Sequence, residues 1–355
     1  MKKIKIFLIP VFIVSLICLN YAQTKKEFHQ AILEIHKKQQ NVGLAAVISN
    51  GGKNVFSDYL GFANLEFNVP VSSKTKFSIA SITKLFTAVT LLKLQAEGKV
   101  DLDTPVKKYI PEFPKKSSKA ITISMLVTHQ SGIPHPSDRT PKLFATHYRS
   151  ALDAIKIFEN DTLLFEPGTQ QRYSSSNYNL LAAVIERITG KLFTDVVKER
   201  IFKPLNLENT SFDNILKPLS NRTQRYSFYH PWTYAESDSL YLVPTWDYSF
   251  NNGGGNIIST ANDLAKFGSA FCDPGFLPEQ QIELLLSESW FGTTNEKGKF
   301  IFTTGANPGV QAALTIYPEK KTVAAVLSNT WGKGSRSLEM VTLSNKLAQI
   351  YIDEY

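Results

Sequence analysis

The order of strand-like and helix-like segments predicts an α+β protein. One antiparallel sheet is expected to be flanked by terminal helices and to carry an inserted, mostly helical lobe. Strand-like segments lie near both ends of the chain, whereas the middle of the chain has mostly helical periodicity. A helix-like segment also lies outside the strands at each end. Because strands from both ends must bury their apolar faces, the simplest assembly is a single sheet built from the two ends.

The first 22 residues are predicted to form a cleavable secretory signal peptide. Three lysines precede a short apolar stretch over residues 6–19, and Ala22 is a small residue suited to cleavage. The apolar stretch is short for a membrane span, which makes an uncleaved anchor the less favoured alternative. A lipoprotein attached through Cys18 is a further alternative, but Ile17 is bulkier than such processing usually requires. The mature protein is therefore expected to be periplasmic or secreted, without membrane contact.

Residues 23–355 are predicted to form one domain with two lobes. The sheet lobe is expected from about 23–76 and 268–355, and the helical lobe from about 77–267. A hairpin around the turn GGK is expected from VGLAAVISN and NVFSDYLGFANL. Three later strands are expected in KFIFTTG, GVQAALTIYP and KTVAAVLSNT. Helices are expected over residues 25–40, 81–97, 121–128, 146–159, 176–189, 193–202 and 335–353, and in ISTANDLAKF, with Ser259 or Thr260 as N-cap before Asp263.

Composition and charge exclude several functional classes. The chain is 43% hydrophobic and 20% charged, as in ordinary globular proteins. Loss of the signal peptide with its three lysines lowers the net charge from +8 to about +5. The remaining charges are interspersed, and the best basic cluster, residues 114–119, is interpreted as a solvated loop, so no nucleic-acid partner is expected. Cys272 would be the only cysteine left and the histidines are scattered, so we expect no metal and no other cofactor.

One lysine lies inside a strongly apolar helical segment. FSIASITKLFTAVTLL (77–92) carries a single charge, Lys84, and a buried ammonium is unfavourable unless it is paired. Ser81 lies three residues earlier on the same helix face, where a desolvated lysine can act as a base toward its hydroxyl. The other Ser-x-x-Lys, Ser73 with Lys76, lies in a polar turn and is interpreted as a coincidence. A snorkelling or structurally paired lysine is the alternative interpretation of Lys84.

Further segments resemble, in order, the serine β-lactamase-like superfamily, which includes class C β-lactamases, D-alanyl-D-alanine carboxypeptidases and related esterases. They span most of residues 30–350: FSIASITKLFTA (77–88), ITISMLVTHQSGIP (121–134), RYSSSNYNLLAAVIERITG (172–190), IFKPLNLENTSF (201–212), GGGNIISTANDLAKF (253–267) and TTGANPGV (303–310). The resemblance implies a β-lactamase/penicillin-binding-protein-like fold and an acyl-enzyme mechanism.

The resemblance also implies a role for each matching residue. Ser81 would be the nucleophile, Lys84 would accept its proton or tune its surroundings, and Tyr173 would be the partner base and later the acid. The backbone N–H groups of Ser81 and Ala306 would form the oxyanion hole. Gly305 would keep its strand thin enough for substrate to lie along it. A core tyrosine with a bonded hydroxyl is the alternative for Tyr173.

Two positions depart from the family pattern. Ser175 stands where the family usually has asparagine, and it offers a substrate amide a shorter reach and fewer donors. Thr303 stands where lysine or histidine is usual, so it and Thr304 would offer a substrate only neutral hydrogen bonds. His129 is interpreted as structural, and glycines 253–255 as turn residues.

The predicted function is therefore that of a secreted, monomeric serine hydrolase that acts on a small-molecule or peptide ester or amide, with weak β-lactamase activity at most. The aromatic stretch 226–250 either supplies an apolar acyl pocket or packs as a loop on the helical lobe. The alternative is a non-catalytic protein that binds cell-wall fragments or a partner. The intact Ser81, Lys84 and Tyr173 favour catalysis, whereas the departures at 175 and 303 keep the alternative open.

Overall fold

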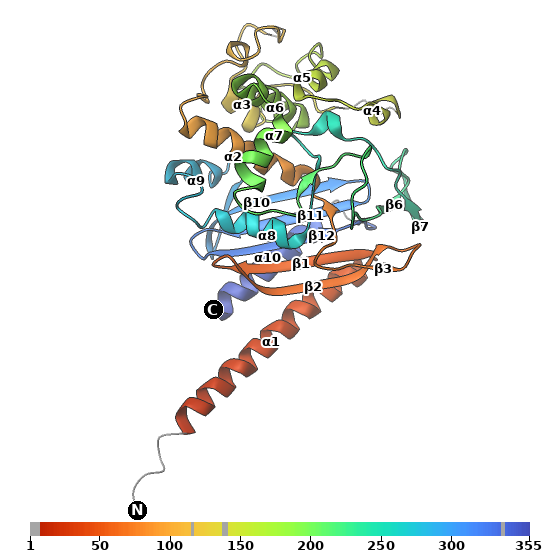
Figure 1. The fold of residues 1–355 in the computed structure, drawn as a ribbon, viewed down its shortest axis with the longest axis vertical. Helices are drawn as coiled ribbons and strands as arrows, with labels where there is room; N and C mark the ends of the chain where they lie inside the picture. Colours follow the sequence, from red (N-terminus) through yellow and green to blue (C-terminus); the bar gives the residue numbers. More distant parts are fainter. Residues whose placement is uncertain (1–7, 115–116, 137–140, 335–337) are drawn as a thin grey trace, which may run out of the picture.

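A seven-stranded antiparallel sheet forms the centre of the computed structural model, which describes residues 8–114, 117–136, 141–334 and 338–355 (Figure 1). The strand order is β3-β2-β1-β12-β11-β10-β9. The strands have these bounds: β1 Gly43–Asn50, β2 Lys53–Asn64, β3 Val69–Pro70, β9 Gly292–Asn295, β10 Gly298–Asn307, β11 Val310–Tyr317 and β12 Thr322–Ser328. The predicted α+β class is confirmed.

Both ends of the chain contribute to this sheet, as predicted. The first hairpin joins β1 to β2 through Gly51 and Gly52, whose positive φ angles suit a tight turn. Strand β12, from the C-terminal part, pairs with β1 on one side and with β11 on the other. The N-terminal and C-terminal parts of the chain therefore pair with each other within the sheet, and the middle of the chain is inserted between them.

The central strands are buried on both faces. In β1, Ala45 and Val47 belong to the core shared with the helical region, whereas Leu44, Ala46 and Ile48 face the terminal helices. Helices α1 (Leu8–Lys38) and α10 (Leu338–Glu354) cover this second face, and α8 (Ala261–Ala270) packs on the first. The helix predicted over 25–40 forms, but it already begins at Leu8. Within the described part of the chain, no helix is both long and apolar enough to cross a membrane.

The inserted region is mostly helical and lies on the side of the sheet opposite α1 (Figure 1). Its α-helices are α2 Thr83–Ala96, α3 Ile123–Val127, α4 Pro141–Ala145, α5 Ala151–Ala154, α6 Ser175–Thr189 and α7 Phe193–Val197, and α9 Glu279–Leu285 follows later in the chain. Short turns extend them: η1 Ala80–Ile82, η2 Val106–Lys108, η3 Ile155–Ile157, the π-helical η4 Lys198–Phe202 and η5 Ser249–Asn251. Phe86 of α2 stacks on Phe267 of α8 at 3.7 Å, which joins the helical region to the sheet.

Two small three-stranded sheets connect these parts. One has the order β4-β8-β5 and the other β13-β6-β7. Their strands are β4 Phe77–Ser78, β5 Ser211–Phe212, β6 Tyr226–Tyr229, β7 Glu236–Leu242, β8 Ile257–Ser259 and β13 Thr330–Trp331. Sequence reasoning did not place these strands, nor α9 and β9, because elements this short carry little periodicity. Of the two predicted N-caps of α8, Thr260 is the one used, and its hydroxyl accepts from the Asp263 N–H.

Candidate active site

Ser81 lies in the short turn that joins a strand to a buried helix. Strand β4 pairs with β8, and the Ile79 N–H donates to the Ile257 carbonyl at 3.0 Å. The next residue, Ala80, has a φ of 42°, which lies in the left-handed region that L-residues with a side chain rarely adopt. The chain then enters η1, which contains Ser81, and continues into α2. The β4–β8 pairing before this turn and helix α2 after it thus hold a strained backbone next to the predicted nucleophile.

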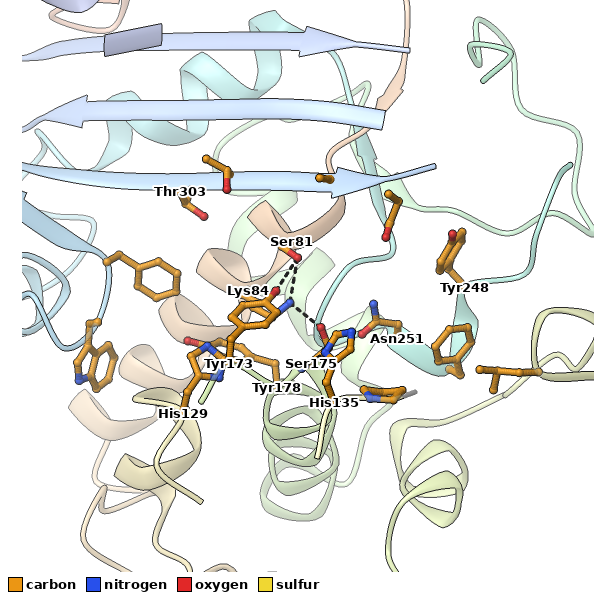
Figure 2. Close-up of a pocket in the computed structure, with 18 of the residues that line it drawn as sticks. Ser81, Lys84, His129, His135, Tyr173, Ser175, Tyr178, Tyr248, Asn251 and Thr303 are labelled. Atoms are coloured by element: carbon orange, nitrogen blue, oxygen red, sulfur yellow. Dashed lines mark hydrogen bonds between the residues drawn. The ribbon is translucent and has the colours of Figure 1, made fainter. Parts of the chain in front are cut away.

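Lys84 lies one turn further, with only 3% of its surface exposed. Its Nζ donates to Ser81 Oγ at 3.1 Å and to Ser175 Oγ at 3.0 Å (Figure 2). It also donates to the Gly254 carbonyl at 2.6 Å. Three acceptors match the three N–H donors of an ammonium group. The apolar helix therefore carries a lysine that is fully hydrogen-bonded as a cation, rather than a snorkelling one.

Tyr173, two residues before the first residue of α6, contacts Ser81. Its hydroxyl lies 2.7 Å from Ser81 Oγ, although 49% of the residue's surface is exposed. Lys84 Nζ lies 4.9 Å from the centre of the tyrosine ring. Burial of the hydroxyl by itself raises the pKa of Tyr173. The Lys84 charge and hydrogen bonds to Lys84, Ser81 and Ser175 together lower it by more, so the pKa is below its usual value. Tyr173 is thus the best placed group to accept the Ser81 proton.

Two histidine rings, those of His129 and His135, lie beside the Tyr173 ring. The His129 ring lies 4.7 Å from the Tyr173 ring, and its Nδ1 accepts from the Ser174 N–H at 3.2 Å. His135 Nδ1 accepts from the Ser175 N–H at 3.1 Å. Burial, together with the charges of Lys84 and His135, lowers the pKa of His129 to about 3. His129 is therefore neutral at physiological pH and does not add a second positive charge beside Tyr173.

Glycines 253 and 254 allow close backbone approach. A Cβ at Gly253 would lie 2.1 Å from the Tyr178 carbonyl, and one at Gly254 would lie 2.3 Å from Asn251 Oδ1. Both lie in a turn, as predicted, and the Gly254 N–H donates to the Asn251 carbonyl at 3.0 Å. Neither has a positive φ, so close packing is the reason that the turn has glycine here. The backbone can then present the Gly254 carbonyl to Lys84 and the Gly253 carbonyl to Thr87 Oγ1.

Strand β10 forms the opposite wall of the site (Figure 2). Thr303, Thr304 and Ala306 line the same cavity as Ser81, as the predicted substrate strand and oxyanion hole require. Gly305 faces the other way. A Cβ there would lie 2.1 Å from the Ile79 carbonyl and 3.1 Å from Ala80 Cβ. Gly305 therefore lets β10 pack against the backbone before Ser81. The prediction was that this glycine makes room for a substrate along the strand, so the structure gives a different reason for it.

The cavity has a volume of about 510 Å³ and largely aromatic walls. Of the predicted aromatic stretch, Tyr248 and Phe250 line it, whereas Tyr226 and Phe228 belong to strand β6. Ser175 also lines the cavity, but its hydroxyl is the one that accepts from Lys84. Within the described residues, no three His, Cys, Asp or Glu side chains lie together in a way that could hold a metal ion.

Sequence reasoning missed several residues of the cavity. They include His135, Asn251, Trp290, Phe291 and Phe302. It also treated His129 as structural, and His129 does line the cavity while it contacts Tyr173. The second histidine in HQSGIPH was the available indication, because it follows a segment already assigned to the family. Phe291 and Trp290 carried no pattern of their own.

The fold is that of the serine β-lactamase-like superfamily. The family model described as Beta-lactamase matches residues 28–345, and the chain belongs to this family. The resemblance drawn from the sequence is thereby confirmed. Many members of the family are serine hydrolases.

Curated relatives include the mouse serine beta-lactamase-like protein LACTB, mitochondrial, at 29% identity over 66% of this chain and 55% of that protein. The penicillin-binding protein 4* of Bacillus subtilis is 26% identical over 86% of this chain and 72% of that protein. The chain thus spans about half the length of its mitochondrial relatives.

Solved structures share the fold. A penicillin-binding protein from Bacillus halodurans has a TM-score of 0.74 at 23% identity, with coverage of 89% of this chain and 98% of that one. The D-amino acid amidase of Ochrobactrum anthropi has a TM-score of 0.74 at 22% identity, with coverage of 92% and 97%.

Proposed function

We propose that this protein is a serine acyl hydrolase that works through an acyl-enzyme on Ser81. The observation that carries the proposal is the position of Ser81 Oγ, 3.1 Å from Lys84 Nζ and 2.7 Å from the Tyr173 hydroxyl oxygen. A serine hydroxyl is a weak nucleophile until a neighbouring base removes its proton. Here one neighbour is a buried cation, and the other is a tyrosine whose pKa that cation lowers.

The reaction would proceed in two halves. Ser81 Oγ attacks the acyl carbon while its proton passes to the Tyr173 oxygen, and the N–H groups of Ser81 and Ala306 stabilise the negative oxygen that forms. Tyr173 then protonates the leaving group, and the acyl–Ser81 ester remains. A water molecule gives its proton to Tyr173 and attacks the ester. Tyr173 then passes that proton to Ser81 Oγ as the bond to the acyl carbon breaks and the acid leaves, which returns Ser81 and Tyr173 to their starting forms.

We infer that the substrate is an uncharged ester or amide with apolar groups. Thr303 supplies no charge where the family pattern usually has a cation, and its residue surface is 7% exposed. Among the described residues that line the cavity, Lys84 is the only lysine or arginine, and its three donors are engaged within the protein. Aromatic residues from several separate parts of the chain, among them Tyr248 and Phe291, offer apolar contact instead.

Reaction with a fluorophosphonate probe tests the proposal directly. Wild-type protein should be labelled, and Ser81→Ala should not. The matched control is Ser73→Ala, because Ser73 belongs to the second Ser-x-x-Lys and is solvent-exposed, so this variant should label like wild type. Labelling that survives Ser81→Ala, or wild-type protein that reacts with no probe, would contradict the proposal and favour the non-catalytic binding protein.

Comparative turnover tests the substrate class. A neutral p-nitrophenyl ester should be hydrolysed faster than nitrocefin, which carries a carboxylate. A nitrocefin rate above the ester rate would show that the absence of a cation at Thr303 has little effect. We further propose a monomer that is periplasmic or secreted, which size-exclusion chromatography and cell fractionation can check.

A further inference from the structure

A second cavity lies behind the wall of the catalytic cavity. It has a volume of about 1030 Å³ and is bounded by α7, η4 and residues 206–222. The segment around η5 separates the two cavities, because Tyr248 and Phe250 line the catalytic one whereas Ser249 and Asn252 line the second one. The predicted reaction uses none of the groups in the second cavity.

Positive charge surrounds the second cavity. Four of the cationic side chains that line it have no hydrogen bond or ion pair with any described residue: Arg149, Lys198, Lys203 and Lys217. The carboxylates without such a partner are Asp195 and Glu208, so the unpaired cations outnumber the unpaired anions by two to one. Asp213, a third carboxylate of the cavity, is already paired with Arg222 and Arg225.

Arg222 adds an unsatisfied donor at the same place. Its Nη2 donates to Asp213 and to the Asn214 carbonyl, but its buried Nε has no partner among the described residues. Buried polar groups in folded proteins are nearly always hydrogen-bonded, and an unsatisfied one is unfavourable. An acceptor from a bound molecule would satisfy this N–H group.

The remaining wall of the second cavity is apolar. Phe202, Leu207 and Phe212 line it from η4 and the chain that follows, and Leu192 lines it with 44% of its surface exposed. A large cavity that combines apolar walls with a few convergent polar groups is the usual form of a small-molecule site.

We propose that the second cavity binds a small organic anion with an apolar tail. Its carboxylate or phosphate head would accept hydrogen bonds from Arg222 and attract Lys198 and Lys203. Its tail would cover Phe202 and Phe212. This site is distinct from the acyl-hydrolase site, and its occupancy does not depend on catalysis at Ser81.

Isothermal titration calorimetry on the full chain tests the site with four probes. Octanoate and octyl phosphate should each bind with one-to-one stoichiometry, and the tighter of the two identifies the preferred head group. Octanol, which lacks the charge, and acetate, which lacks the tail, should each bind at least tenfold more weakly. Octanol binding equal to that of both anions, or no binding of either anion, would overturn the proposal.

Charge variants localise the binding. Arg149→Gln/Lys198→Gln/Lys203→Gln should weaken the preferred anion at least tenfold. Lys53→Gln/Lys107→Gln/Lys320→Gln removes the same charge from exposed positions outside the cavity and should bind like wild type. Thr194→Trp, which places a large ring in the cavity, should also abolish binding, and thermal unfolding checks that each variant folds. Equal binding by all variants, which the catalytic cavity would produce, overturns the proposal.

Discussion

At the candidate site, the positive charge of Lys84 acts on the phenol group of Tyr173. Lys84 is buried and fully hydrogen-bonded, and its charge lowers the pKa of Tyr173 against the opposite effect of burial. His129 packs on Tyr173, yet the same burial and the same Lys84 charge keep its imidazole neutral. The serine therefore has one cation and one base as neighbours, and their effects can be separated by substitution.

Replacement of Lys84 should move the pH profile of ester hydrolysis. In the proposed mechanism Tyr173 acts as the phenolate, so kcat/KM should rise with pH as Tyr173 loses its proton. Lys84→Gln removes the positive charge that lowers the Tyr173 pKa, so the rising limb should shift to higher pH. At neutral pH, kcat/KM should fall by about 100-fold or more.

The control for this substitution is Lys93→Gln, near the other end of α2, where Lys93 donates to the Phe276 carbonyl. Its pH profile should match that of wild type. If the rising limb of kcat/KM in Lys84→Gln lies at the same pH as in wild type, Tyr173 is not the titrating base.

A cation at position 303 should shift selectivity toward anionic substrates. Thr303 lines the cavity beside Thr304 and carries no charge. Thr303→Lys places an ammonium where a substrate carboxylate can meet it, so the ratio of nitrocefin to neutral-ester turnover should rise about tenfold, the effect of one favourable charged contact. Thr294→Lys adds the same charge at an exposed position of β9 and should leave the ratio unchanged.

At the level of elements, the site depends on close contacts between segments that are distant in sequence. Strand β10 packs against the backbone that precedes Ser81, the glycine segment before β8 packs against α6, and Tyr173 lies two residues before α6 begins. Each contact leaves no space for an additional carbon atom. Small changes at these positions should therefore reach the catalytic atoms through backbone movement.

Gly305→Ala should impair activity through such a movement. The new Cβ would lie 2.1 Å from the Ile79 carbonyl, so β10 must move away from the Ser81 turn. We expect a stability loss of about 1–3 kcal/mol, as for other overpacked sites, together with a large fall in kcat/KM. Thermal unfolding and ester kinetics measure both effects. Gly275→Ala, where a Cβ would meet only Asp273 Oδ1 at 3.3 Å, should be close to neutral; equal loss in both variants would refute the explanation.

Glu186 of α6 should be a stability determinant of the helical region. It is buried, and its carboxylate accepts from the N–H groups of Ala151, Leu152 and Phe193 at 2.9–3.0 Å, which ties α6 to the starts of α5 and α7. Glu186→Ala leaves three buried donors unsatisfied and should lower the free energy of unfolding by about 3 kcal/mol or more. Urea denaturation measures the loss, and the exposed Glu319→Ala is the control. A loss below about 1 kcal/mol would mean that water replaces the carboxylate.

At the scale of the whole molecule, the sheet is the frame on which the inserted helical region is mounted. Its centre joins β1, from the N-terminal part, to β12 and β11, from the C-terminal part. Helices α1 and α10 cover one face, and the other face carries the core that continues into the helical region (Figure 1). The catalytic cavity lies where β10 meets the start of α2 and the start of α6.

Hydrogen exchange should report this hierarchy. The amides of β1, β11 and β12 should exchange slowest, because these strands are paired on both sides or buried on both faces. Those of β3 and β9, at the two edges of the sheet, should exchange much faster. Mass-spectrometric exchange measures both groups in one experiment. Equal protection of the edge and central strands would contradict a single sheet as the most stable unit.

The sequence by itself determined the class of fold, the main strands and helices, and the candidate catalytic residues Ser81, Lys84 and Tyr173. These follow from local pattern: strand-like and helix-like apolar runs, a cap at Ser259 or Thr260 before Asp263, one charge in an apolar helix, and motif segments in family order. Short elements such as β4, β8 and η5 were out of reach, because they exist only through contacts with distant segments.

Only the tertiary structure decided how these residues act together. It gave Lys84 a third partner in the Gly254 carbonyl, turned Ser175 toward the lysine, and placed Gly305 against Ile79. It also placed the neutral His129 against Tyr173 and opened a second, cation-lined cavity behind η5. The physical reason is that distances of 2–3 Å between segments more than 90 residues apart depend on packing of the whole chain, which local periodicity does not encode.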